Sequence, residues 1–173
     1  MKWEWAALKC LISKGYGYLL PSYWQKRQRA DRVVEKELPL FPSYLFCRFD
    51  LQNRVGLGRV VSTPGVRRIV SFGGEPAAVV DHEIEALVKL MATEMPREPW
   101  RYIPFGVRLR IDIGPLAGVE GIRQPNGSNR KLVLSVALLQ RSVAVTLAHN
   151  TMVTVLGLSP VGAKAEGTID IAH

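Results

Sequence analysis

Cysteine and histidine are scarce in this chain, long apolar runs are missing, and each shortage excludes a class of protein. The two cysteines, Cys10 and Cys47, cannot build a disulfide framework, and no Cys-x-x-Cys pair is present to hold zinc. The three histidines lie far apart, without the spacing of metal ligands. No apolar run approaches the ~20 residues of a membrane span, and residues 1–5 lack the apolar core of a signal peptide. We therefore expect a cytoplasmic protein without a membrane segment, a metal or a cofactor.

Signatures of catalysis are also missing. Gly73 and Gly74 precede no helix with a phosphate-binding lysine, and no serine stands in a nucleophile elbow. Asp112 and Glu120 flank a turn, and solvation at a surface is enough to explain them. We therefore predict that the protein is not an enzyme.

Positive charge is plentiful, with a formal net charge of +8 at pH 7. Such an excess indicates contact with something acidic, and nucleic acid or a large nucleic-acid machine is the leading interpretation. A soluble basic protein without such a partner is the alternative. The segment after Trp24 is basic and lacks periodicity, so we interpret it as a hairpin loop. Its cations either contact nucleic-acid phosphates or are simply solvated, and they are Lys26, Arg27, Arg29 and Arg32.

Residues 39–49 organise the first half of the chain. Aromatic residues suit a pleated, half-buried strand, and alternation places Tyr44 and Phe46 on one face and Leu45 and Cys47 on the other. Both faces are largely apolar, so the segment reads as a central strand covered on both sides. Two prolines precede it and cannot donate to a ladder, which confines its entry to an edge, a bulge or a loop.

Helices and further strands complete residues 1–95. Apolar residues at helical spacing predict one helix that ends at Gly15 and another that begins at Asp81. Residues 51–61 are ambiguous, because their two glycines argue against a stable helix. Extended segments are expected at residues 16–23, 33–38 and 66–72.

The second half has a different character. Residues 96–104 hold three prolines and read as a semi-rigid linker. Five short alternating strands separated by turns then predict a small closed barrel over residues 105–157. Residues 158–173 are small and polar and read as a disordered tail. The predicted fold class is α+β, an antiparallel sheet with flanking helices followed by the barrel.

Several separate motifs resemble, in order and spacing, the NusG family of transcription elongation factors. They are Pro-Leu-Phe-Pro-Ser-Tyr-Leu-Phe at residues 39–46, Ser-Thr-Pro-Gly-Val at residues 62–66 and Phe-Gly-Gly at residues 72–74. In addition, Gly-Pro-Leu-Ala-Gly-Val-Glu-Gly at residues 114–121 looks like the core of a KOW motif. The family usually has Gly where this chain has Ser43.

The resemblance implies a domain organisation. Residues 1–95 should form a NusG-type N-terminal domain that binds RNA polymerase, and residues 105–157 a KOW domain with an SH3-like barrel. Members of the family normally begin with a strand that leads into the first helix. The spacing here leaves no room for both, so we expect that first strand to be missing.

The resemblance also implies a binding face on the first domain. In the family, an apolar depression there receives the coiled-coil clamp helices of the largest RNA polymerase subunit. A place in the core is the alternative for each matching residue, and the factor is expected to be a monomer. The matching residues are Phe41, Tyr44, Phe46, Tyr18 and Leu20.

A second implied site lies on the barrel. In the family, the loop between the third and fourth barrel strands recruits a small-subunit ribosomal protein or the termination factor Rho. Leu139 stands where the family often has Phe, which leaves Rho binding open, and a plain barrel loop is the alternative. The residues from 138 to 145 look more like the specialised branch of antiterminators that act on particular long operons. The matching loop residues are Leu138, Leu139, Gln140, Arg141 and Ser142.

The predicted function is therefore a non-enzymatic factor that binds RNA polymerase and modulates elongation, termination or antitermination. The alternative is a general RNA- or ribosome-binding module, because the KOW motif also occurs in ribosomal proteins. The first reading predicts loss of polymerase binding on Phe41→Ala or Tyr44→Ala. The second predicts binding to RNA alone with a steep salt dependence.

Overall fold

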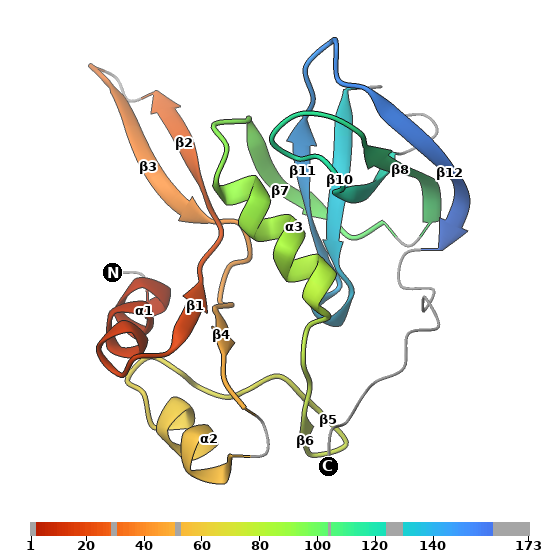
Figure 1. Cartoon of the computed structure of the whole chain (residues 1–173). Helices are drawn as coiled ribbons and strands as arrows, with labels where there is room; N and C mark the ends of the chain where they lie inside the picture. The colour runs from red at the N-terminus through yellow and green to blue at the C-terminus, as the bar shows by residue number, and fades with distance from the viewer. Residues whose placement is uncertain (1–2, 29–30, 51–52, 104, 124–129, 161–173) are drawn as a thin grey trace.

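The computed structural model describes residues 3–28, 31–50, 53–103, 105–123 and 130–160 (Figure 1). In the first half of the described chain, three helices surround three small antiparallel sheets. The helices are α1 (Trp3–Ser13), α2 (Arg54–Val61) and α3 (Asp81–Met91). The strand pairs are β1 (Gly17–Leu19) with β4 (Phe46–Arg48), β2 (Ser22–Gln28) with β3 (Val33–Pro39), and β5 (Ser71–Phe72) with β6 (Glu75–Pro76).

After α3 the chain forms a six-stranded antiparallel sheet in the order β12-β8-β9-β10-β11-β7. A short 3₁₀ turn, η1 (Ala137–Leu139), joins its fourth and fifth strands in the chain. The predicted α+β class is confirmed. The strands are β7 (Arg97–Arg101), β8 (Phe105–Ile111), β9 (Glu120–Arg123), β10 (Lys131–Val136), β11 (Arg141–Thr146) and β12 (Val153–Pro160).

The first helix ends where the sequence predicts. Gly15 has a φ of +77°, its N–H donates to the Ile12 carbonyl at 2.9 Å, and the Tyr16 N–H donates to the Leu11 carbonyl at 3.2 Å. These two bonds form the Schellman pattern, which satisfies carbonyls at the end of a helix and favours glycine. Ala7, Leu8 and Leu11 form the buried face of α1.

The basic segment predicted as a loop is mostly strand, which corrects the sequence prediction. β2 and β3 pair without interruption from Ser22 opposite Pro39 to Gln28 opposite Val33. The turn therefore needs only the residues between Gln28 and Val33, and the cations that precede it lie on the ribbon itself. This hairpin extends away from the other elements (Figure 1).

Two other extended segments are shorter than predicted. Residues 16–23 form β1 and then β2, because Pro21 lies between them and has no N–H to give to a ladder. Of residues 66–72, only Ser71 and Phe72 are in a strand, paired across the Gly73-Gly74 turn.

The ambiguous segment at residues 51–61 contains the helix α2 despite its glycines. The Asn53 side-chain oxygen accepts the Gly56 N–H at 2.9 Å and caps the start of the helix. At the other end, Lys14 Nζ donates to the Arg59 carbonyl at 2.8 Å and to Thr63 Oγ1 at 2.7 Å. These tertiary contacts compensate for the poor helix propensity of glycine.

The predicted linker at residues 96–104 contains a strand, which is a further correction. β7 pairs with β11 over its whole length. The physical reason is Trp100, which packs against a buried cluster of Ile103, Ile122, Val133 and Ala144. The proline in this strand is tolerated because β7 is at the edge of the sheet.

The predicted tail also begins within a strand. β12 extends to Pro160 and pairs with β8, so residues 158–160 belong to the sheet. The rest of the predicted tail, residues 161–173, lies outside the described residues.

One hydrophobic core joins the two halves of the molecule. Leu40 and Phe41, together with Leu87 and Leu90 of α3, are at most 1% exposed and pack with residues of the barrel. The helix α3 lies against the barrel sheet (Figure 1). The boundary predicted at residue 95 therefore does not separate two cores. The barrel residues of this core are Leu109, Ile111, Leu116, Val119, Leu132, Leu134, Val136, Val143, Val145 and Leu147.

Polar contacts fasten the same two halves. Lys89 Nζ donates to the Ala117 carbonyl at 3.1 Å, and the Ala137 N–H donates to Glu83 Oε1 at 3.1 Å. Arg97 makes three further bonds: its Nε donates to the Ser22 carbonyl at 3.0 Å, and its Nη1 donates to two carbonyls at the end of α3. A guanidinium is favourable there because the last carbonyls of a helix carry partial negative charge.

Candidate partner-binding surfaces

The aromatic stretch is presented by a tight turn. The Tyr44 N–H donates to the Phe41 carbonyl at 3.0 Å, with Pro42 and Ser43 between them. Ser43 has a φ of +71°, and its N–H donates to Glu4 Oε1 of α1 at 2.9 Å. A proline followed by a residue with positive φ is the pattern of a type II turn. The turn is therefore held both by its own hydrogen bond and by the first helix.

The turn directs Phe41 inward, to the place in the core that the sequence leaves open as the alternative for this residue. Phe41 is 0% exposed and meets Phe46 edge to face, with ring centroids 5.6 Å apart and an interplanar angle of 89°. The reason is the docked barrel, whose apolar strands complete the core around Phe41. Phe46 and Tyr44 are half-buried against that core. Tyr18 is 50% exposed on β1, while Leu20 is buried.

The predicted barrel loop faces this aromatic stretch. Leu138 and Leu139 in η1 are half-buried and pack on the same core as Tyr44 and Phe46. The Arg141 guanidinium lies over the Tyr44 ring, 5.5 Å from its centroid. The structure therefore brings together two surfaces that the sequence predicts as binding sites for two different partners.

The remaining two loop residues are structural. Gln140 is in the left-handed conformation with a φ of +51°, and its side chain donates to the Ala137 carbonyl at 2.9 Å. Ser142 is 1% exposed, and its hydroxyl shares a hydrogen bond with that of Ser135 at 2.8 Å. A partner at this loop would meet Gln140 but not Ser142.

The cations of the β2–β3 hairpin do not form one cluster. Lys26 forms an ion pair with Glu35 at 3.2 Å, whereas Arg27 points to the opposite face of the ribbon, where Lys36 also lies. Arg32 is exposed, and Arg29 lies outside the described residues. Trp24, which begins the basic segment in the sequence, is 64% exposed on the same face as Lys26.

Comparison with known proteins identifies the family. Residues 4–88, from α1 into α3, match the family model described as "Transcription termination factor nusG". This chain belongs to the NusG family. One solved structure, described as "Domain interaction in Thermotoga maritima NusG", matches with a TM-score of 0.48 at 21% sequence identity. That match covers 84% of this chain and 85% of the Thermotoga chain.

The contacts that dock the barrel of this NusG-family factor are not apparent from its sequence. Glu83 stands in the first turn of α3, a position that the helix dipole alone explains. In the structure its Oε2 is buried and has no hydrogen-bond partner among the described residues. Burial raises the pKa of the Glu83 carboxyl, although the Ala137 N–H and the nearby His82 lower it.

The described part of this NusG-family chain offers no metal centre. No group of three or more potential ligands among His, Cys, Asp and Glu comes together within it. Cys10 and Cys47 are free, and burial raises the pKa of the Cys47 thiol, which makes it less reactive. Within the same described ranges, no helix is both long enough and apolar enough to span a membrane.

Proposed function

We propose that this NusG-family transcription factor binds RNA polymerase through the aromatic face at residues 40–46. We further propose that the barrel loop at residues 138–142 recruits a second protein, either a small-subunit ribosomal protein or Rho. The observation that supports both proposals is that these two apolar surfaces pack against each other in one interface. Each covers apolar side chains that would otherwise be exposed, as is typical of protein-binding patches.

The proposal requires the barrel to move away before polymerase binds. Phe41 is 0% exposed and Tyr44 is covered in part by Arg141, so a partner cannot reach them in the docked arrangement. Because only the undocked fraction of molecules can bind, docking weakens the apparent affinity for polymerase. Variants that loosen docking should then bind more tightly than the natural chain.

The test is binding of the full chain to a stalled RNA polymerase elongation complex. Tyr44→Ala should weaken binding by about tenfold or more, which is the usual effect of truncating a central aromatic anchor. Leu139→Ser should strengthen binding, because it removes an apolar contact from the docked interface. The matched control is Phe105→Ala, an exposed aromatic at the start of β8, which is separated from β11 by two strands of the sheet.

Two results would contradict the proposal. One is unchanged binding of Tyr44→Ala when its thermal unfolding matches that of the natural chain. The other is an equal loss of binding for Tyr44→Ala and Phe105→Ala, which would mean that the aromatic face is not the contact.

One observation favours the alternative of an RNA-binding KOW module. Residues 97–160 contain eight Lys or Arg and three Asp or Glu, which gives the barrel region a net charge of +5 out of +8 for the chain. Binding of RNA in the absence of polymerase, steeply weakened by salt, would support this second function.

A further inference from the structure

Like charges face each other at one place in the barrel sheet. Three paired positions in the described strands place two charged residues directly opposite each other. Two of these pairs have opposite signs, Lys26 with Glu35 and Arg110 with Glu120. The third has Arg101 of β7 opposite Arg141 of β11. Like charges in directly opposite positions destabilise a sheet. This arginine pair therefore lowers the stability of the sheet, whereas the other two pairs do not.

No described carboxylate neutralises this arginine pair. Other barrel cations have partners: Arg108 is paired with Glu120, Arg110 lies 3.7 Å from Asp112, and Lys131 is paired with Glu98. Glu98 cannot serve Arg101, because residues three positions apart in a strand point to opposite faces. Both arginines are exposed, so their charges are available to a ligand.

The surroundings of Arg141 orient its guanidinium. Its centre lies 5.5 Å from the centroid of the Tyr44 ring. A guanidinium that contacts an aromatic ring in this way still has N–H groups free to bind another partner. Residues directly opposite on antiparallel strands lie on the same face, with Cβ atoms about 5 Å apart. Two exposed arginine side chains that start from that Cβ spacing can both reach the oxygens of one phosphate.

We propose that Arg101 and Arg141 form a binding site for the phosphodiester backbone of a single-stranded nucleic acid. The site lies on the barrel, so it is separate from the cations of the β2–β3 hairpin. Phosphate contacts carry no sequence information. The site therefore increases the affinity for nucleic acid and does not select a particular base sequence. The net charge of +5 over residues 97–160 attracts the same ligand.

The test is fluorescence anisotropy of the full chain with a labelled 12-mer of oligouridylate, without polymerase. Arg101→Gln/Arg141→Gln should weaken binding at least tenfold at low salt. It should also reduce the slope of log affinity against log salt by about 0.7, since the two arginines together neutralise one phosphate and each neutralised phosphate of a single strand contributes about 0.7. The matched control, Arg108→Gln/Arg110→Gln, removes the same charge from cations that have acidic partners and should change affinity less than threefold.

Thermal unfolding shows whether a variant loses binding because it loses stability. Removal of the repulsion between Arg101 and Arg141 should offset the loss of the contact between Arg141 and Tyr44 and leave the Tm unchanged, whereas a structural role would lower it. Arg101→Lys/Arg141→Lys keeps the positive charge but loses the planar guanidinium with its several N–H donors. It should bind the RNA with an affinity between those of the natural chain and the double Gln variant.

Three outcomes would overturn the proposal. The first is full binding by the double Gln variant, and the second is an equal loss for the control, which would mean a general effect of charge. The third is competition by a 12-mer oligoglutamate as effective as that by unlabelled RNA, which would assign the site to an acidic protein. None of these outcomes bears on polymerase binding, because no polymerase is present.

Discussion

At the scale of single residues, several positions adopt conformations or environments that have a cost in free energy. Ser43 and Gln140 have positive φ without being glycine, and the Glu83 carboxyl is buried with one oxygen unpaired among the described residues. All three lie in or beside the interface between the aromatic turn, α3 and the barrel. Strain of this kind persists only where surrounding contacts hold it in place.

Ser43 offers a direct test of that strain. The left-handed conformation costs about 1–2 kcal/mol for a residue with a Cβ, and glycine loses roughly 0.5–1 kcal/mol to its greater freedom in the unfolded chain. Ser43→Gly should therefore stabilise the protein by about 0.5–1 kcal/mol and raise the Tm by roughly 2 °C. Ser62→Gly is the control, because Ser62 has a φ of −75°. A fall in Tm for Ser43→Gly in a thermal unfolding experiment would contradict this account.

The raised pKa of Glu83 predicts that the stability of the protein depends on pH. Its pKa is raised in the folded protein, so the folded state binds the proton more tightly than the unfolded state. The stabilisation from this proton is present at low pH and is lost as the pH rises from the ordinary pKa through the raised one. Glu83→Gln keeps an oxygen for the Ala137 N–H and removes the charge, so its Tm should exceed that of the natural chain at pH 7.

The advantage of Glu83→Gln should shrink as the pH falls toward 4, where the natural carboxyl becomes protonated. His82 lies near this carboxyl and lowers its pKa, and a His82→Gln background tests that the trend belongs to Glu83. Thermal unfolding from pH 4 to pH 8 measures the difference in Tm between Glu and Gln at position 83, with His82 present and with His82→Gln. A constant difference in Tm across that range would show that the carboxyl does not titrate.

At the scale of elements, the sequence predicts the helices and strands that have apolar periodicity and misses those that depend on tertiary contact. The helix that ends at Gly15 and the one that begins at Asp81 are both present, as are five barrel strands. β7 could not be predicted because Pro99 within it, with two more prolines in the surrounding segment, resembles a linker, and only an edge position makes a proline in the strand tolerable. α2 could not be predicted because its caps include Lys14, which is distant in the sequence.

The candidate binding surfaces also combine residues that the sequence identifies with contacts that only the tertiary structure reveals. Phe41, Tyr44 and Leu139 could be singled out from motifs, because their types and order are local features of the chain. Their contact with one another could not, since no local pattern reveals which apolar faces pack together. The pairing of Arg101 with Arg141 was likewise hidden, because it depends on the register of a strand that the sequence does not suggest.

The hydrogen bonds of Arg97 allow a prediction about what holds β7 against the first half of the chain. Its guanidinium donates to one carbonyl of β2, one of α3 and one just after α3, and hydrogen bonds from charged groups contribute about 1.5–3 kcal/mol. Arg97→Ala should therefore lower the free energy of unfolding by about 2 kcal/mol, measured by urea titration. Arg101→Ala, on the same face of the same strand, is the control and should cause no loss. Equal losses for both would mean that β7 is not fastened through Arg97.

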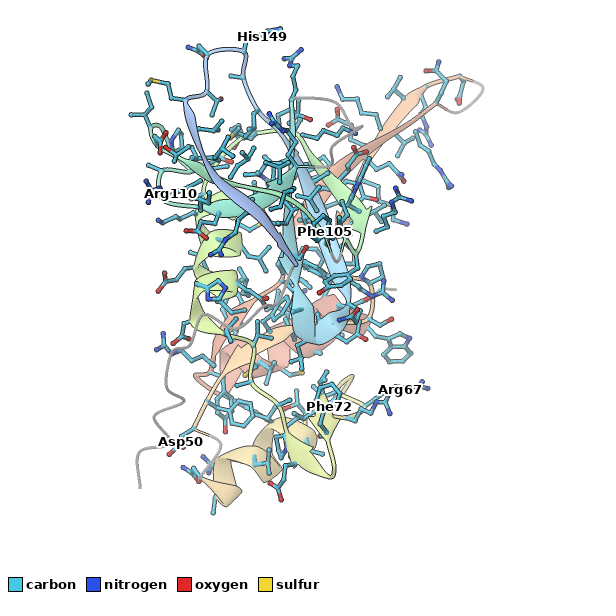
Figure 2. All side chains as sticks on the ribbon, turned by 90° about the vertical axis from the view of Figure 1, so that its right-hand side faces the viewer. Asp50, Arg67, Phe72, Phe105, Arg110 and His149 are labelled. Atoms are coloured by element: carbon cyan, nitrogen blue, oxygen red, sulfur yellow. The ribbon has the colours of Figure 1, made fainter. Side chains whose placement is uncertain are left out.

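At the scale of the whole molecule, the two halves differ in what they offer to partners but share one core. Figure 2 shows that Arg67 and Phe72 lie toward one end of the molecule, and Arg110 and His149 toward the barrel end. Between these ends, α3 and the aromatic turn meet the barrel in an interface built largely from apolar residues. The polar contacts across it include one carboxylate that is only half satisfied, so docking is held mainly by burial of apolar surface.

The most direct test of the central claim is amide hydrogen exchange of the full chain, free and bound to a stalled RNA polymerase elongation complex. If polymerase replaces the barrel on the aromatic face, residues 41–46 should stay protected while residues 137–142 lose protection. If both segments keep the exchange rates of the free protein in a saturated complex, the barrel has not moved. Polymerase would then bind elsewhere, and the proposal that residues 40–46 are its contact would be wrong.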